Sequence, residues 1–172
     1  MRKVILPLLF ILLFVFESTF VQMVPPKEFF GGERFLIPHF LMIAILFLTI
    51  YGSAKYGILY GVIFGLLFDI VYIEVIGIYL FLFPVIAYIV SQVMRVLQNN
   101  MVVTSLVVLF GVAVLESGSY GMNLIIGRTE MTFADFSFIR LIPTLIINLV
   151  FIILAVYPLK RHFEKFIESL SE

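Results

Sequence analysis

The feature that most constrains this chain is a succession of apolar runs, each about long enough to cross a lipid bilayer as a helix. A spanning helix needs about 20 consecutive apolar residues. The sequence has six such runs, separated by polar residues, glycine and proline, at about 4–24, 35–51, 56–73, 76–94, 101–121 and 139–157. The sequence therefore predicts an all-α integral membrane protein of about six transmembrane helices, forming a single multi-pass domain over residues 1–172.

Composition supports this class and narrows the functions open to the chain. Hydrophobic residues make up 63% of the 172 residues and charged residues 13%, against about 45–50% apolar in a soluble domain. The 11 basic residues balance the 11 acidic ones, so a nucleic-acid partner is not expected. The chain has no cysteine and no nucleotide-binding, dinucleotide-binding, zinc-protease or serine-nucleophile motif. We expect no enzyme activity, no cofactor and no metal site.

The charges also predict an orientation in the membrane. The first run lacks a small-residue cleavage site, so we interpret it as a retained span rather than a signal peptide. With the N-terminus inside, seven Lys and Arg residues fall on the cytoplasmic side and four outside, which predicts that both termini are cytoplasmic. Residues 158–172 place apolar side chains at helical spacing and predict a cytoplasmic amphipathic tail on the inner leaflet.

A stripe of small residues marks the third run. Gly57, Gly61 and Gly65 lie four residues apart, on one face of a helix, where a neighbouring helix can approach closely. The pattern favours packing within the protein, and the alternative is a contact with a second copy or with a partner protein.

Four charged residues fall within the apolar runs. By helical rise, Glu17, Asp69 and Glu116 each lie roughly 20 Å from the inner end of their run. Arg140 begins the last run near the same level. A charge left unpaired in lipid costs at least about 2.5–3.5 kcal/mol. We therefore predict that the four residues form a polar cluster that opens to the outside. An ion path and separate exposure at the interface are the alternatives, and Asn148 is predicted to donate an interhelical hydrogen bond.

The longest outer loop, residues 130–140, combines a helix start with an apolar side. Thr132 and Asp135 have the spacing of a capping box. The candidate docking residues of this loop are Met131, Phe133, Phe136 and Phe138. The segment is interpreted as an anchor at the membrane surface, with docking of an outer partner as the alternative.

Several segments, taken in order, resemble the rod-shape-determining MreD family. They are FESTF at 16–20, RFLIPHFLM at 34–42, YGVIFGLLFDIVY at 60–72, GIYLF at 77–81 and MTFADFSFIRLIPTLIINL at 131–149. The resemblance implies a non-enzymatic scaffold subunit of the elongation machinery that controls lateral peptidoglycan synthesis and rod cell shape. It implies MreC as the direct partner, with RodA, penicillin-binding protein 2, MreB and RodZ in the same machinery. It also implies a fold similar to the substrate-binding S components of energy-coupling-factor transporters.

Two functions remain open from the sequence. In the first, the single-span MreC partner packs against the outer half of this protein, and membrane lipids surround the rest. In the second, the chain is an S-component-like protein that binds or transports a small molecule or a lipid precursor. Stabilisation by a ligand would favour the second function.

Overall fold

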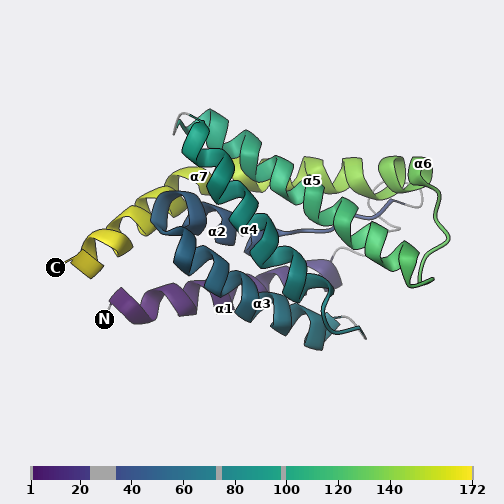
Figure 1. Cartoon of the computed structure of the whole chain (residues 1–172), viewed down its shortest axis with the longest axis horizontal. Coiled ribbons are helices and arrows are strands. Elements are labelled where there is room, and N and C mark those ends of the chain that lie inside the picture. Colours follow the sequence, from purple (N-terminus) through teal and green to yellow (C-terminus); the bar gives the residue numbers. More distant parts are fainter. Residues whose placement is uncertain (1, 24–33, 73–74, 98–99, 172) are drawn as a thin grey trace.

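The computed structural model describes residues 2–23, 34–72, 75–97 and 100–171, and its regular elements there are helices (Figure 1). The long helices are α1 (Arg2–Met23), α3 (Ala54–Tyr72), α4 (Ile78–Val96), α5 (Met101–Ile125) and α7 (Ile142–Ser171). The short ones are α2 (Phe40–Phe47) and α6 (Phe133–Asp135). Two π-helical segments, η1 (Leu48–Gly52) and η2 (Phe136–Leu141), extend α2 and join α6 to α7.

Five helical stretches are long and apolar enough to cross a membrane. They are α1, α3, α4, α5 and the continuous helix formed by α6, η2 and α7. The protein is thus an all-helical, multi-pass membrane protein. Both ends of the chain lie at the same end of the bundle (Figure 1).

The second predicted span, residues 35–51, differs from the sequence expectation. Its helical part, Phe40–Gly52, is about 20 Å long, too short for a hydrocarbon core of about 30 Å. Residues 34–39 have no helical structure. Pro38 gives the physical reason: the residue before a proline is disfavoured in the helical region, so a helix begins only after it. The second apolar run is therefore a non-helical segment followed by a short helix.

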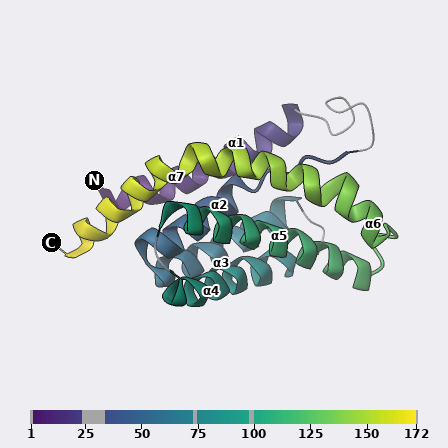
Figure 2. The ribbon, with the colours of Figure 1, turned by 90° about the horizontal axis from the view of Figure 1, so that it is seen from above.

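Helix α2 forms the centre of the molecule. All eight of its residues are buried, and it contacts α1, α3, α4, α5 and α7. Helices α1 and α7 cover it on one side and α3, α4 and α5 on the other (Figure 2). A helix that is hydrophobic all round is stable only in such a surrounded position.

The predicted tail, residues 158–172, also differs from the expectation of a separate helix on the leaflet. Helix α7 continues without a break through Pro158 to Ser171. Leu159, Phe163 and Phe166 are buried, and Phe163 stacks on Phe10 of α1 with ring centroids 6.3 Å apart. The amphipathic pattern is present, but its apolar side packs against the protein's own helices and is not free for the leaflet or for a partner.

The glycine stripe of α3 packs within the protein. A Cβ atom on Gly61 would lie 3.1 Å from the backbone nitrogen of Pro84, and one on Gly65 would lie 2.9 Å from the carbonyl carbon of Tyr79, both in α4. On Gly57 it would lie 2.9 Å from the Cα atom of Thr49 in η1. Glycine is needed at these positions because backbone meets backbone. This glycine seam is therefore closed to a second copy or a partner.

Candidate functional site

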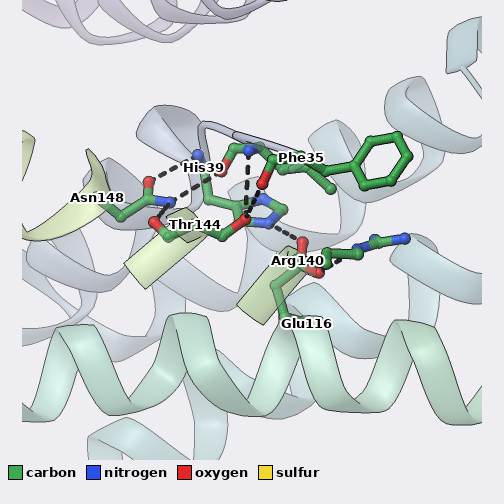
Figure 3. A network of polar contacts seen from close by, with 7 residues as sticks. Phe35, His39, Glu116, Arg140, Thr144 and Asn148 are labelled. Atoms are coloured by element: carbon green, nitrogen blue, oxygen red, sulfur yellow. Dashed lines mark hydrogen bonds and ion pairs between the residues drawn. The ribbon is translucent and has the colours of Figure 1, made fainter. Parts of the chain in front are cut away.

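The non-helical segment 34–39 poses the main structural problem of the fold. Its peptide groups lie beside apolar helices, where no water can bond them, so protein groups must do so. Helix α7 and η2 supply the partners on one side (Figure 3). The amide of Phe35 donates to the carbonyl oxygen of Ile139 at 2.8 Å. The amide of Ile37 donates to Thr144 Oγ1 at 3.3 Å.

Asn148 completes this arrangement one helical turn further along α7. Its Oδ1 accepts from the amide of His39 at 2.8 Å. Its Nδ2 donates to the carbonyl oxygens of Ile37 at 2.9 Å and Thr144 at 2.7 Å. Residues 35, 37 and 39 thus turn backbone groups toward α7 with the alternation of an extended strand. We call Ile139, Thr144 and Asn148 the α7 clamp. Asn148 was predicted to donate an interhelical hydrogen bond, and its Nδ2 donates to the backbone of this non-helical segment.

A group of ionisable side chains closes the end of the clamped segment. Glu116 points from α5 toward His39 and Arg140 (Figure 3). His39 Nε2 lies 2.5 Å from Glu116 Oε1, and Arg140 Nε donates to Glu116 Oε2 at 2.7 Å. Each carboxylate oxygen therefore has its own donor. We call His39, Glu116 and Arg140 the charge triad.

The π-helical turn η2 accounts for the position of Arg140. A π turn widens the helix locally, a feature that is frequent at functional sites. Glu116 is fully buried, whereas the Arg140 side chain is 27% exposed. A carboxylate so enclosed has no room for a substrate, so the triad joins α5, α7 and the start of α2 rather than forming an open catalytic pair.

The other two predicted members of the cluster form no hydrogen bond or ion pair with this triad among the described residues. Glu17 lies at the start of α2, where its Oε2 accepts from the amide of Leu41 at 2.9 Å. Asp69, fully buried, accepts from the amides of Gly77, Tyr79 and Leu80 at 2.8–3.0 Å. Each carboxylate thus bonds the unpaired amides at a helix start. Glu17 lines one cavity with His39 of the triad, whereas Asp69 is a cap for α4.

The outer loop divides into buried and exposed residues. The Thr132–Asp135 pair bonds as the capping pattern predicts, with the amide of Asp135 donating to Thr132 Oγ1 at 3.2 Å. Phe136 is buried and stacks on Tyr120 at 4.2 Å between ring centroids. Met131 is half-buried, whereas Phe133 and Phe138 are 68% and 70% exposed. Of the four predicted docking residues, these two phenylalanines are the ones open to a partner.

Sequence reasoning missed His39, Thr144 and the backbone of residues 34–39. One signal was present: Thr144 and Asn148 lie four residues apart in an otherwise apolar run, so they share a helix face. Nothing in the sequence indicates that this face meets a non-helical segment rather than another helix. Among the residues that the structure describes, no group of three His, Cys, Asp or Glu side chains is placed to hold a metal ion.

Comparison with known proteins identifies the family. The family model for rod shape-determining protein MreD matches residues 1–166. The chain belongs to the MreD family. It is also 31% identical over 172 residues to the rod shape-determining protein MreD of Bacillus subtilis (strain 168), covering 100% of this chain and 99% of the relative. No solved structure matches, so the S-component likeness stays a prediction.

MreD membership implies a role in determining rod cell shape. MreD proteins are shape-determining proteins and in general not enzymes. For this MreD-family chain the α7 clamp, together with His39 and Arg140 of the charge triad, lies in two segments that carried the family resemblance, residues 34–42 and 131–149, whereas Glu116 lies outside them in α5. What these segments build is a rigid junction between α2, α5 and α7.

Proposed function

We propose that this protein is a non-enzymatic membrane scaffold of the bacterial elongation machinery, which binds MreC and thereby helps to control lateral peptidoglycan synthesis. The observation that carries the proposal is the MreD family match over nearly the whole chain. RodA, penicillin-binding protein 2, MreB and RodZ act in the same machinery under this proposal. A scaffold needs a surface of fixed shape, and the clamp and triad fix the outer half of α7.

The surface that we assign to MreC is an apolar strip along η2 and α7. Phe138, Ile142, Ile146 and Val150 are all exposed and follow one another at four-residue intervals. They therefore form one face of the helix. We call these four residues the outer strip. A membrane span packs against such a face through van der Waals contact.

A groove beside the outer strip gives it a shape that a partner helix can fit. The groove has a volume of about 190 Å³ and is lined by Arg34, Leu36, Phe138, Ile142, Pro143 and Ile146. Arg34 is exposed and adds a positive charge at one end. We expect the span of MreC to lie along the strip and an acidic or polar group near the end of that span to meet Arg34.

Orientation is part of the proposal, with both termini in the cytoplasm. The end of the bundle that carries the two termini also carries the α2–α3 and α4–α5 connections (Figure 1). Lys55 and Arg95 lie at these connections, and Lys160, Arg161 and Lys165 lie toward the C-terminus of α7. The opposite end, with Arg34, Phe133 and Phe138, then faces outward, on the side where the extracytoplasmic domain of MreC begins.

Copurification tests the proposal. The double variant Phe138→Ala, Ile142→Ala removes two exposed side chains of the outer strip without touching the triad. We expect recovery of tagged MreC to fall about tenfold, because anchor residues in an interface carry most of its affinity. The matched control is Val102→Ala, Leu106→Ala, which truncates two exposed apolar residues of α5.

The control variant should bind MreC as the unchanged protein does. Equal recovery with both double variants, at unchanged thermal stability, would show that the outer strip does not hold MreC. Failure of the unchanged protein to copurify with MreC in several detergents would remove the proposed partnership itself.

A further inference from the structure

A cavity of about 230 Å³ lies between α1, the segment 34–39 and the α3–α4 turn. Glu17 and His39 are its buried polar residues, and Phe68, Tyr72 and Tyr79 supply aromatic rings. Known small-molecule sites occupy about 300–1,000 Å³. This cavity is smaller, so it has room for a compact polar group but not for a whole metabolite or lipid precursor.

Glu17 brings a buried carboxyl group to the cavity. Its side chain is only 4% exposed. Among the described residues no Lys or Arg forms an ion pair with it. It accepts hydrogen bonds from the amides of Leu41 and Phe40 at the start of α2. The start of α2 offsets roughly half of one charge, so an ionised Glu17 is stabilised further by a cation in the cavity.

His39 adds a second acceptor. Its Nε2 faces a Glu116 oxygen, which accepts a hydrogen bond but has no proton to donate beside Arg140. When the ring is neutral and Nε2 carries its proton, Nδ1 is left as an acceptor. That Nδ1 is buried and has no hydrogen-bond partner within the described part of the chain. Glu17 and His39 can therefore each accept a hydrogen bond from a donor in the cavity.

The aromatic rings fit the same kind of ligand. The ring centroid of Phe68 lies 5.0 Å from that of Tyr72 and 5.4 Å from that of Tyr79. Aromatic faces attract cations, and clustered rings are a recurrent way to recognise ammonium groups. Tyr72 and Val21 are exposed near the ends of α3 and α1, so the cavity opens where these helices end.

We propose that this cavity binds a protonated primary amine, such as the headgroup amine of phosphatidylethanolamine. The ammonium group supplies one positive charge for Glu17, three N–H donors for the acceptors of the cavity and a cation for the three rings. The cavity shares no lining residue with the outer strip or its groove, and an amine site there goes beyond the proposed function. A lipid headgroup and a free amine share this chemistry, and the experiment separates them.

The test compares thermal unfolding of the full chain in nanodiscs of phosphatidylethanolamine and of phosphatidylcholine with the same acyl chains. The choline headgroup is a quaternary ammonium without N–H donors. For a tenfold preference we expect Tm to be about 3–5 °C higher in phosphatidylethanolamine. Glu17→Gln keeps an oxygen for the amide of Leu41 but removes the charge, and it should abolish this difference. Glu164→Gln, at an exposed acid of α7, should keep it.

A second variant and a free-amine arm complete the design. Tyr72→Leu removes a ring at the mouth of the cavity without changing Glu17, and it should also reduce the Tm difference between the two lipids. If Glu17→Gln does not fold, the result for Tyr72→Leu tests the proposal in its place. Ethanolamine added to phosphatidylcholine nanodiscs should raise Tm only if a soluble amine is the ligand. An undiminished lipid difference in both variants, or no amine-dependent shift in the unchanged protein, overturns the proposal. Glu17→Gln should still copurify with MreC.

Discussion

The glycine seam and the α7 clamp hold the same bundle together by opposite means. At the seam, α3 lies against α4 and η1 because side chains are absent, and backbone contacts backbone at Gly57, Gly61 and Gly65. At the clamp, a non-helical segment lies against α7 because side chains are present and bond its backbone. The first contact depends on shape and the second on donors and acceptors.

This difference determines what a substitution does in each region. An added methyl group at the seam displaces a neighbouring helix, and the cost depends on how far the backbone can move. A lost donor near the clamp leaves a buried charge or peptide group without its partner, and in lipid no water replaces it. The seam therefore does not tolerate added side-chain volume. The clamp and the triad instead do not tolerate the loss of a hydrogen-bond donor or acceptor.

The largest effect is expected for Arg140→Glu in the charge triad. It removes a donor from Glu116 and places a second negative charge beside a fully buried carboxylate. Breaking a buried pair in this way destabilises a protein by about 3–5 kcal/mol. Thermal unfolding followed by circular dichroism in detergent measures the loss. The control is Arg161→Glu at an exposed position of α7, and equal stability of the two variants would exclude a structural role for the triad.

Asp69 lies beside the glycine seam but acts through hydrogen bonds, so it tests whether the two mechanisms can be separated. Asp69→Leu leaves three amides at the start of α4 unpaired, and we expect a loss of at least about 2 kcal/mol. Asp69→Asn retains an acceptor oxygen and should lose about half as much. Similar thermal unfolding of both variants would show that the charge, rather than hydrogen bonding, is required.

Gly65→Ala tests the seam directly. The added Cβ would meet the backbone of Tyr79 and Leu80, so we expect destabilisation of about 1–3 kcal/mol. Gly121→Ala in α5 is the matched control because nothing lies within 4 Å of a Cβ there. Alanine should stabilise that helix by about 0.5–1 kcal/mol. Thermal unfolding shifts of the same sign in both variants would contradict close backbone packing at the seam.

The smallest effect is expected for Thr144→Val in the α7 clamp. The hydrogen bonds of Thr144 to the Ile37 amide and the Phe35 carbonyl are long, at 3.3 and 3.5 Å. Side-chain hydrogen bonds between membrane helices average about 0.6 kcal/mol. Asn148→Leu, which removes three shorter bonds, should lower the thermal stability more. If Thr144→Val cost as much as Asn148→Leu, the clamp would not depend on these bonds.

The helices were predictable because hydrophobic length determines them in a membrane. Four of the long helices begin and end within a few residues of the predicted runs. The close packing at Gly57, Gly61 and Gly65 was also the favoured prediction, since a four-residue stripe has a direct geometric meaning. Asn148 was predicted as a donor for the same reason, because an amide within an apolar run must find a partner.

Two parts of the site could not be predicted. The second apolar run is as hydrophobic as its neighbours, and only Pro38 indicates that its first third is not helical. The acids share a depth along their helices, but depth does not tell which way each side chain points. Asp69 turns to the amides eight to eleven residues further along its own chain, whereas Glu116 reaches α7. Such choices depend on the tertiary structure.

Site-specific crosslinking to MreC tests the central claim most directly, and the absence of natural cysteines in this chain makes it practicable. Cysteines replace Phe138 and Ile142 on the outer strip, or the exposed Leu59 and Ile63 on α3, opposite single cysteines along the span of MreC. The account predicts crosslinks from the outer strip and none from α3. Crosslinks from α3 alone, in an intact complex, would contradict it.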